Sequence, residues 1–354
     1  MDARSLLICH EIHTIGTSDP SFCPLGTLFA DLTLWRIHMK DIATLTINPA
    51  LDISTTVSKV MPDRKLRCGP AERESGGGGI NVSRAIKRLG GDAAAVYPAG
   101  GETGTLFQTL LDEEKIPNHP TPIRGLTRES FSVLEKSSGH QFRFSTPGPE
   151  LDKKEWSRCL EELTRVSPNP DYVVGSGGIP PGVPEDFYAR AAEKAKELGA
   201  RFILDTHGKP LAQAASKGIY LIKANMNEIQ ELLGEKIQNE THLEDSLERL
   251  LSEGTSEIIV VSLGAAGALM LSQEGRYRIR APIVPIRSRV GAGDSMVAGM
   301  TMGLAQGYSL TQALMYGIAA GSAAVMTPGT ELCKGEDARN LFHRLIENSK
   351  DNEP

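Results

Sequence analysis

Short apolar runs recur along the chain from about residue 40 onward, with longer segments of mixed polarity between them. They occupy residues 42–47, 93–97, 172–174, 202–204, 220–222 and 258–261. A short run that is apolar at every position is typical of a central parallel strand, because such a strand is covered on both faces. These runs therefore predict the strands of a buried, mostly parallel sheet.

Segments with the period of an amphipathic helix lie between and after these runs. They occupy residues 81–89, 106–111, 185–198, 226–233, 243–251, 309–326 and 335–346, and a helix rich in small residues is predicted at 296–306. A chain in which strands and helices alternate folds as a doubly wound α/β domain. We therefore expect a mostly parallel sheet with helices on both faces.

Two segments, residues 54–74 and 127–146, break this rhythm. Both show two-residue alternation, for example Phe131 with Val133, and neither contains a helical period. Such alternation is the pattern of strands with one covered face. The two segments predict a small separate β-sheet that forms a lid over one edge of the main domain.

The first 38 residues differ in pattern from the rest of the chain. Their apolar run from Ser5 to Cys9 is cut short by His10 and Glu11, so it makes a poor signal peptide. The strand–helix pattern starts after Met39. The sequence predicts one large domain over residues 39–350, preceded by an extension, residues 1–38, that is poorly ordered or results from an upstream start.

The overall composition excludes several classes of protein. With 354 residues, 40% of them hydrophobic and 23% charged, the chain can bury the core of one large domain. A net charge of −6 and a pI near 5.8 argue against a nucleic-acid-binding protein, whose surface would be basic. The five cysteines are scattered without a Cys-x-x-Cys pair, which argues against a zinc site and favours a reducing, cytoplasmic location. No apolar run approaches the length that crosses a bilayer, so no membrane association is expected.

Two glycines and an aspartate, Gly291, Gly293 and Asp294, open the predicted small-residue helix. Glycine lets the backbone approach a ligand closely, and the first amides of a helix, which have no partner inside it, attract an anion. An aspartate just past such amides can take a proton from a hydroxyl while negative charge develops on a phosphoryl group. A glycine turn in which Asp294 merely caps the helix is the alternative.

A run of four glycines, residues 76–79, leads into the predicted helix that contains Asn81. Such a run loses much backbone entropy on folding, so a ligand lying against the backbone would explain it, with the Asn81 amide bonding hydroxyls. A flexible linker is the alternative. The run does not fit G-x-G-x-x-G, because Asn81 stands in place of the last glycine, and the chain has no G-x-x-x-x-G-K-[ST] motif. This disfavours a dinucleotide-dependent oxidoreductase.

Five motifs occur in the order found in a known family. They are Thr-Ile-Asn-Pro-Ala-Leu-Asp at residues 46–52, the glycine run ending in Asn81, Lys-Ala-Asn-Met-Asn-Glu at 223–228, Ser-Leu-Gly at 262–264 and the turn at 291–294. From Met39 to about Cys333 the chain thus resembles the ribokinase-like, or PfkB-type, carbohydrate kinases. Finer motifs at residues 65–68, 127–128 and 142–144 are similar to the branch of minor-type 6-phosphofructokinases.

The resemblance implies a ribokinase-like fold and an ATP-dependent phosphotransferase that acts on an alcohol group. In that branch the acceptor is the 1-hydroxyl of fructose 6-phosphate and the product is fructose 1,6-bisphosphate, a step of glycolysis. Tagatose-6-phosphate kinase and 1-phosphofructokinase of the same family are the alternatives, although these usually carry a lysine within the glycine run, where this chain has Gly78 and Gly79. A binding or regulatory protein that kept the fold and lost turnover is a further alternative, against which the retained Asp294 speaks.

On the nucleotide side, the resemblance assigns the catalytic roles to Asp294 as the base and to the amides of Gly291, Ala292 and Gly293 as the anion hole. Mg²⁺ would be positioned by Asn225 and Glu228, mainly through waters. A surface glutamate favoured by the helix dipole is the alternative for Glu228. The residues that would bind ATP are Lys223, Asn225, Ser262, Gly264 and Gly267. The alternatives are a solvated lysine at the edge of a strand for Lys223 and a bare turn for residues 262–267.

On the sugar side, the resemblance assigns the binding of ring hydroxyls to Asp52, at the end of the first strand, backed by Gly77, Gly78 and Asn81. A turn aspartate after Pro49 is the alternative for Asp52. The 6-phosphate would be bound by Lys65, Arg67 and Arg128, which would give an acidic protein the basic pocket that an anionic substrate needs. Arg143 either joins them or lies exposed on a lid strand. The resemblance also implies a homodimer formed through the lid, in which Arg67 could act across subunits.

The chain departs from the family pattern in three places. Lys-Pro-Asn of the family is Lys223-Ala224-Asn225 here, which loosens the turn but keeps the functional side chains. Residues 176–178 read Ser-Gly-Gly where family members often have Ser-Gly-Ser, so the second hydroxyl, which would touch the sugar, is missing at Gly178. Many members bind a monovalent cation with carbonyls around Ser288, Val290 and residues 327–331. Here Thr327, Pro328 and Glu331 differ from the branch, which puts a K⁺ site in doubt.

Overall fold

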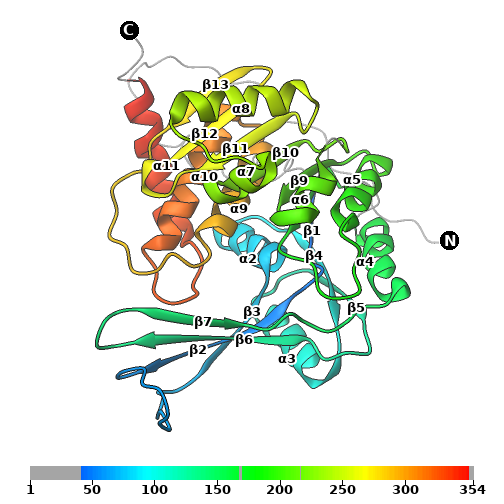
Figure 1. Cartoon of the computed structure of the whole chain (residues 1–354), viewed down its shortest axis with the longest axis vertical. Helices are drawn as coiled ribbons and strands as arrows, with labels where there is room; N and C mark the ends of the chain where they lie inside the picture. Colours follow the sequence, from blue (N-terminus) through cyan, green and yellow to red (C-terminus); the bar gives the residue numbers. More distant parts are fainter. Residues whose placement is uncertain (1–40, 167–169, 216, 351–354) are drawn as a thin grey trace, which may run out of the picture. The chain divides into compact units, whose positions relative to one another are not determined.

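The computed structural model describes residues 41–166, 170–215 and 217–350. Over these ranges, strands and helices alternate and build two sheets (Figure 1). The expected α/β architecture with a separate small sheet is therefore confirmed. The predicted extension, residues 1–38, lies outside the described residues, and the predicted domain boundary stays a prediction.

The larger sheet, called the main sheet below, contains nine strands in the order β13-β12-β11-β10-β9-β8-β1-β4-β5. Neighbours from β11 to β5 are parallel, whereas β12 and β13 extend the other edge in antiparallel pairing. The strands are β1 (Ile42–Leu45), β4 (Ala94–Ala99), β5 (Asn118–Pro122), β8 (Tyr172–Ser176), β9 (Arg201–Asp205), β10 (Leu221–Asn225), β11 (Ile258–Ser262), β12 (Ala268–Ser272) and β13 (Gly275–Ile279). Because parallel strands end at the same edge, residues after β8, β9 and β10 can share one crevice.

Helices lie between the strands of the main sheet along the chain, and α9, α10 and α11 follow its last strand. They are α2 (Gly78–Leu89), α3 (Gly101–Glu113), α4 (Lys153–Val166), α5 (Phe187–Glu197), α6 (Gly208–Ala214), α7 (Met226–Leu233), α8 (Glu240–Ser252), α9 (Ala292–Ala305), α10 (Leu310–Val325) and α11 (Gly335–Lys350). In the part of the chain that the structure describes, none of them is both long and apolar enough to span a membrane.

Alternate residues of β1 face opposite sides of the main sheet, as the strand geometry requires. Ala43 and Leu45 belong to the hydrophobic core that also contains side chains of α4 and α5. The hydroxyl of Thr44, in contrast, lies 2.7 Å from that of Ser83 on α2, and α2 packs against α9. The main sheet is thus covered by helices on both faces, as the apolar runs predict.

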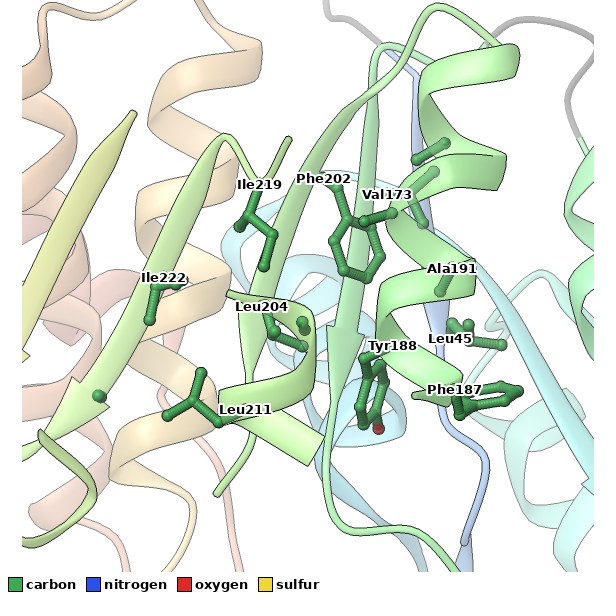
Figure 2. Close-up of a cluster of buried hydrophobic side chains, with 14 of the residues drawn as sticks. Leu45, Val173, Phe187, Tyr188, Ala191, Phe202, Leu204, Leu211, Ile219 and Ile222 are labelled. Atoms are coloured by element: carbon green, nitrogen blue, oxygen red, sulfur yellow. The ribbon is translucent and has the colours of Figure 1, made fainter. Parts of the chain in front are cut away.

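The core on the α5 face centres on two adjacent aromatic residues, Phe187 and Tyr188 (Figure 2). Their rings meet edge to face with centroids 5.4 Å apart, and both are fully buried among residues such as Leu45 and Phe202. The Tyr188 hydroxyl donates a hydrogen bond of 2.8 Å to the carbonyl oxygen of Gly177. The core thereby fixes the turn that follows β8.

The smaller sheet, called the lid sheet below, has four strands in the order β3-β2-β6-β7. They are β2 (Ala50–Val57), β3 (Glu72–Gly76), β6 (Arg128–Glu135) and β7 (Gln141–Ser145). β2 pairs parallel with β6 and antiparallel with β3, and β6 and β7 are antiparallel. Large apolar side chains remain exposed on it, notably Phe131 at 43% and Phe144 at 58%.

Asp52 lies in a different strand from the one predicted. β1 ends at Leu45, and Asp52 is the third residue of β2, so the lid sheet begins before residue 54. The turn at Pro49 separates the two strands, because proline has no amide to donate to a sheet. The alternation of Leu51 and Ile53 then carries the chain into the lid sheet. Asp52 therefore approaches the main domain from the lid.

Candidate active site

A cavity of about 550 Å³ is lined by residues of both sheets. The lid sheet contributes Ala50, Asp52, Arg128, Ser130, Phe131, Ser132, Arg143, Phe144 and Ser145. The main domain contributes Gly77, Gly78, Asn81, Ser176, Gly177, Asp205, Thr206, His207, Lys223, Glu228, Gly293, Asp294 and Thr330. Most of the predicted substrate and phosphoryl-transfer residues therefore share one enclosure, although they are far apart in the sequence.

The start of α9 forms one wall of this cavity. Gly291 caps the helix in the left-handed conformation with φ of 72°, and a Cβ at this position would lie 2.7 Å from the Leu332 side chain. Only glycine meets both conditions without strain. The first amides of α9 have no partner inside the helix, so Ala292 and Gly293 can offer theirs to an anion.

Asp294 lies at the third position of α9 and accepts a hydrogen bond of 2.8 Å from the side-chain amide of Asn81. Burial raises the pKa of Asp294 to about 6, and the nearby Asp205 carboxylate acts in the same direction. The Asn81 hydrogen bond and the charge of Lys223 oppose this rise. Asp294 is thus ionised at neutral pH and a stronger proton acceptor than an ordinary aspartate. Asn81 was predicted to bind sugar hydroxyls, and its side-chain amide uses one of its two N–H groups to donate to Asp294.

Lys223 is buried in the middle of β10 and pairs with Asp205 at the end of β9, with 3.0 Å between Nζ and Oδ1. Burial lowers the pKa of Lys223, but the charges of Asp205, Glu228 and Asp294 outweigh it and raise the pKa above its usual value. A Cβ on Gly293 would lie 3.1 Å from Nζ, so the ammonium group faces the start of α9. The structure thus places a fixed positive charge beside the amides of the proposed anion hole.

Asp205 is a site residue that the sequence reading missed. It lines the cavity, and its partner Lys223 is 18 positions away in the sequence. The signal that could have found it is an acidic residue at the carboxyl end of a predicted parallel strand, where such sheets bind ligands.

Asn225 and Glu228 cap α7 reciprocally. The Asn225 side chain accepts hydrogen bonds from the amides of Asn227 and Glu228, at 2.9 and 3.1 Å, and Glu228 accepts one of 2.7 Å from the Asn225 amide. Of the two, Glu228 lines the cavity, and burial raises its pKa despite the opposing Asn225 amide and Lys223 charge. The cap fixes the Glu228 carboxylate in a defined direction.

The carboxylates of Glu228, Asp205 and Asp294 suit a hard cation such as Mg²⁺, which prefers oxygen ligands and keeps several waters. Among the described residues, no three His, Cys, Asp or Glu side chains come close enough to hold an ion directly. The donor set therefore fits a magnesium ion held through waters and substrate oxygens, not one enclosed by protein ligands.

The glycine run packs tightly against the main sheet at the start of α2. A Cβ on Gly78 would lie 2.3 Å from the Ser176 hydroxyl, and a Cβ on Gly79 would lie 2.6 Å from that of Thr46. Gly77, at φ of 111°, precedes the helix and lines the cavity with Gly78. The run is therefore not a flexible linker. Gly78 and Gly79 leave no room for a Cβ, and Gly77 and Gly78 line the cavity.

Two arginines of the lid sheet surround Asp52. Burial raises the pKa of Asp52 to about 6, and the charges of Arg143 and Arg128 oppose this. Arg128 donates hydrogen bonds to Ser145 Oγ at 2.8 Å and to the carbonyl oxygen of Asn48 at 3.2 Å. Arg143, whose position the sequence left open, lines the cavity with Arg128.

Lys65 and Arg67 are exposed in the segment between β2 and β3 and do not line the cavity. The structure thus brings Arg128 and Arg143 together, not the predicted trio of Lys65, Arg67 and Arg128. The physical reason is the length of the connection, residues 58–71, which carries the two side chains beyond the ends of the lid strands.

The other residues predicted to bind ATP, Ser262, Gly264 and Gly267, do not line the cavity. The Ser262 hydroxyl, at the end of β11, donates to the Ala224 carbonyl oxygen at 3.3 Å. Gly264 and Gly267 follow it with φ of 58° and 93°, and a Cβ on Gly267 would lie 2.0 Å from the Ile279 carbonyl oxygen. β11 pairs parallel with β10, and Ser262 lies opposite Asn225. These residues therefore lie at the same end of the main sheet as the end of β10.

Comparison with known proteins gives matches over most of the chain. The model of the pfkB family carbohydrate kinases matches residues 46–337. The ATP-dependent 6-phosphofructokinase isozyme 2 of Mycobacterium tuberculosis H37Rv is 42% identical over 313 residues, which cover 88% of this chain and 92% of that protein.

Solved structures of phosphofructokinase-2 from Escherichia coli are similar in fold. The complex with potassium has a TM-score of 0.84 at 37% identity, and the complex with fructose-6-phosphate a TM-score of 0.82 at 36% identity. In each case the match covers 87% of this chain and 100% of the other.

Proposed function

Because this chain belongs to the pfkB family of carbohydrate kinases, we propose that it transfers the γ-phosphoryl group of ATP to the 1-hydroxyl of fructose 6-phosphate. The products are ADP and fructose 1,6-bisphosphate, which makes the chain an ATP-dependent 6-phosphofructokinase of glycolysis. The observation that carries the proposal is a single cavity lined by Gly293 and Asp294 at the start of α9 and by Arg128 and Arg143 of the lid sheet.

The chemistry follows from the fixed charges of the cavity. Asp294 takes the proton of the attacking hydroxyl, and its pKa of about 6 suits that role near neutral pH. The amides of Gly291, Ala292 and Gly293 and the Lys223 ammonium group stabilise the negative charge of the transferred phosphoryl group. Magnesium, when bound, neutralises phosphate charge, and Glu228 and Asp205 would hold it through waters.

The polarity of the cavity sets the orientation of the sugar phosphate. The existing phosphate lies toward Arg128 and Arg143, where charged hydrogen bonds hold it, and the free hydroxyl lies toward Asp294. Asp52 binds ring hydroxyls between the two ends. A 6-phosphate with an open 1-hydroxyl meets both demands, whereas fructose 1-phosphate would have to bind reversed.

A coupled assay over a panel of sugar phosphates tests this function. We expect fructose 6-phosphate to exceed fructose and fructose 1-phosphate in kcat/KM, with tagatose 6-phosphate as the nearest competitor. Free fructose leaves the lid arginines unpaired and loses about 1.5–3 kcal/mol for each charged hydrogen bond. Equal kcat/KM values for fructose and fructose 6-phosphate would overturn the assignment.

A second copy of this chain is the partner that the lid sheet fits. Phe131 and Phe144, which lie opposite each other in the pairing of β6 with β7, are 43% and 58% exposed, and adjacent apolar side chains of this size are uncommon on the surface of a monomer. Lys65 and Arg67 extend from the same sheet, where they could reach the cavity of the partner. Sedimentation equilibrium of the parent chain and of Phe144→Ser tests this. We expect a dimer that dissociates in the variant, and a monomeric parent would overturn the proposal.

A further inference from the structure

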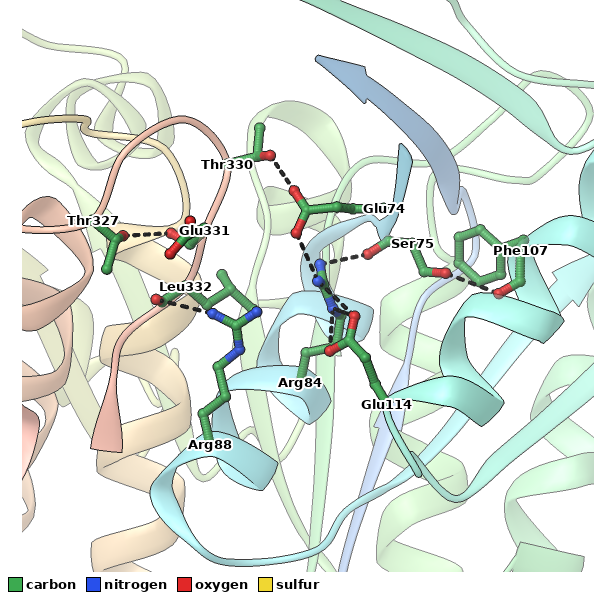
Figure 3. Close-up of polar contacts among 10 residues, drawn as sticks. All are labelled: Glu74, Ser75, Arg84, Arg88, Phe107, Glu114, Thr327, Thr330, Glu331 and Leu332. Atoms are coloured by element: carbon green, nitrogen blue, oxygen red, sulfur yellow. Dashed lines mark hydrogen bonds and ion pairs between the residues drawn. The ribbon is translucent and has the colours of Figure 1, made fainter. Parts of the chain in front are cut away.

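A buried arginine ties the lid sheet to the helices beneath it (Figure 3). The side chain of Arg84 on α2 is 3% exposed and donates to Glu74 of β3 at 3.0 Å and to Glu114, after α3, at 2.8 and 3.0 Å. It also donates to the Ser75 carbonyl oxygen at 2.8 Å. The guanidinium group is thus held from three sides and fixes the first Glu74 oxygen, Oε1.

The second oxygen of Glu74, Oε2, accepts a hydrogen bond from the hydroxyl of Thr330. Burial raises the pKa of Glu74, but the charge of Arg84 and the Thr330 hydrogen bond outweigh it and leave the pKa below its usual value. Glu74 is therefore ionised at neutral pH and can only accept hydrogen bonds. Thr330 has to be the donor of this pair.

The direction of that hydrogen bond determines what Thr330 offers to the cavity that it lines. A threonine hydroxyl has one hydrogen to donate and two lone pairs that accept. Since the hydrogen is committed to Glu74, the lone pairs remain for a ligand. Phosphate and carboxylate oxygens are acceptors and cannot use them, whereas a hydroxyl group can donate to them.

The loop that carries Thr330 is held on both sides. The Thr327 hydroxyl donates to the Glu331 carbonyl oxygen at 2.9 Å, and Arg88 donates to that of Leu332 at 3.2 Å (Figure 3). Glu74 lies opposite Asp52 in the pairing of β3 with β2. Thr330 is thus positioned in the part of the cavity where Asp52 is proposed to bind the sugar.

We propose that Thr330 accepts a hydrogen bond from a hydroxyl group of the sugar phosphate and so determines specificity, while Glu74 and Arg84 are positioning residues that orient it. This inference rests on the proposed function, because a sugar phosphate supplies the donor hydroxyl. It adds a contact from the loop after α10 to those from the lid sheet and α2.

The first test compares Thr330→Val with Thr330→Ser. Valine keeps the shape of threonine but lacks the hydroxyl. We therefore expect KM for fructose 6-phosphate to rise about tenfold, which corresponds to the loss of one neutral hydrogen bond. KM for ATP should be unchanged. Serine keeps the hydroxyl and should stay within about twofold of the parent. Thr109→Val, on the exposed face of α3, is the matched control and should have no effect. A loss confined to the KM for ATP would overturn the role of Thr330.

The second test uses substrate analogues in which one hydroxyl is inverted or absent. Tagatose 6-phosphate inverts the 4-hydroxyl, psicose 6-phosphate the 3-hydroxyl, and 2,5-anhydromannitol 6-phosphate lacks the anomeric one. For the analogue whose altered hydroxyl is the partner of Thr330, Thr330→Val should lose no further kcat/KM. An equal loss on every sugar phosphate would overturn the inference. Absence of turnover by the parent on any sugar phosphate would instead overturn the proposed function.

The third test concerns Glu74. A glutamine at this position can donate to Thr330 and let its hydroxyl turn, so Glu74→Gln should raise KM for fructose 6-phosphate several-fold without changing that for ATP. Glu72→Gln, an exposed change on the same strand, is the control. The double variant Glu74→Gln with Thr330→Val should be no worse than Thr330→Val alone. Additive losses would show that Glu74 acts only through stability and would overturn its positioning role.

Discussion

The main sheet and the lid sheet border the same cavity, yet they differ in how they are covered. Central strands of the main sheet are buried at every position of their apolar runs, as at Val173 and Val260, which are both 0% exposed. The lid sheet leaves Phe131 and Phe144 open to solvent. In the proposed function, the groups that carry out phosphoryl transfer come from the packed sheet and the helices on it, and those that hold the sugar come largely from the lid.

This contrast has a physical basis. Phosphoryl transfer depends on charges fixed within fractions of an ångström, which dense packing provides. Substrate entry requires that part of the enclosure can move, and a sheet packed on one face only has fewer contacts to break. Changes on the main-sheet side should therefore reduce kcat, and changes on the lid side should raise KM for the sugar phosphate.

The largest effect is expected from Asp294→Asn. The amide keeps the size of the side chain but cannot take the proton, so kcat should fall by about 10²–10⁴-fold. ATP binding, measured by calorimetry, should be unchanged. Turnover within a factor of a few of the parent would show that Asp294 only caps α9.

On the lid side, Arg128→Ala should raise KM for fructose 6-phosphate by about 10–100-fold, the equivalent of one charged hydrogen bond of about 1.5–3 kcal/mol. KM for ATP should change little. Arg128 also holds Ser145 and Asn48, so Arg143→Ala, which leaves those hydrogen bonds intact, is the companion variant with a smaller expected rise. An effect of Arg128→Ala confined to ATP would contradict its placement at the sugar phosphate.

The two sides should also differ in their pH dependence. Burial raises the pKa of both Asp294 and Asp52 to about 6, so each loses its charge as the pH falls through that value. Activity should therefore rise between about pH 5 and 7 and then level off. Protonation of Asp52 should raise KM for fructose 6-phosphate at acid pH, and protonation of Asp294 should lower kcat. In Asp52→Asn the change in KM with pH should disappear, while the fall in kcat remains. A kcat profile that stays flat down to pH 5 would exclude Asp294 as the base.

The smallest effect is expected at the N-terminus. A chain that starts at Met39 should keep the melting temperature, the dimer and the kinetics of the full chain, because β1 begins at Ile42. A loss of more than a few degrees in Tm on truncation would show that the first 38 residues stabilise the domain.

Local signals in the sequence account for much of the fold. α7 was predicted at the residues where it lies, because Asn225 and Glu228 mark its start and Gly234, at φ of 69°, ends it. β5 was not predicted, since Pro120 and Pro122 argue against a strand, and the structure tolerates them because β5 lies at the edge of the main sheet. α4 was also missed, because charged residues outnumber its narrow buried stripe of Trp156, Cys159 and Leu163.

The lining of the cavity could be predicted from the sequence where one motif supplies it, and less well where residues of separate strands combine, while the roles of these residues stay predictions. The turn at Gly291 and Asp294 is readable from local sequence alone. Asp205 was not found, because its pairing with Lys223 depends on β9 and β10 being neighbours. Lys65 and Arg67 stay a prediction for the dimer, since one chain does not bring them to the cavity.

The hydrogen bond from Asn81 to Asp294 has a consequence for the base itself. It engages one carboxylate oxygen, Oδ2, so in the proposed mechanism Oδ1 is left to receive the proton. A carboxylate held in this way cannot rotate freely, so its two oxygens are no longer equivalent. The conformational entropy of the side chain is lost once, when the protein folds, and not again in each catalytic cycle.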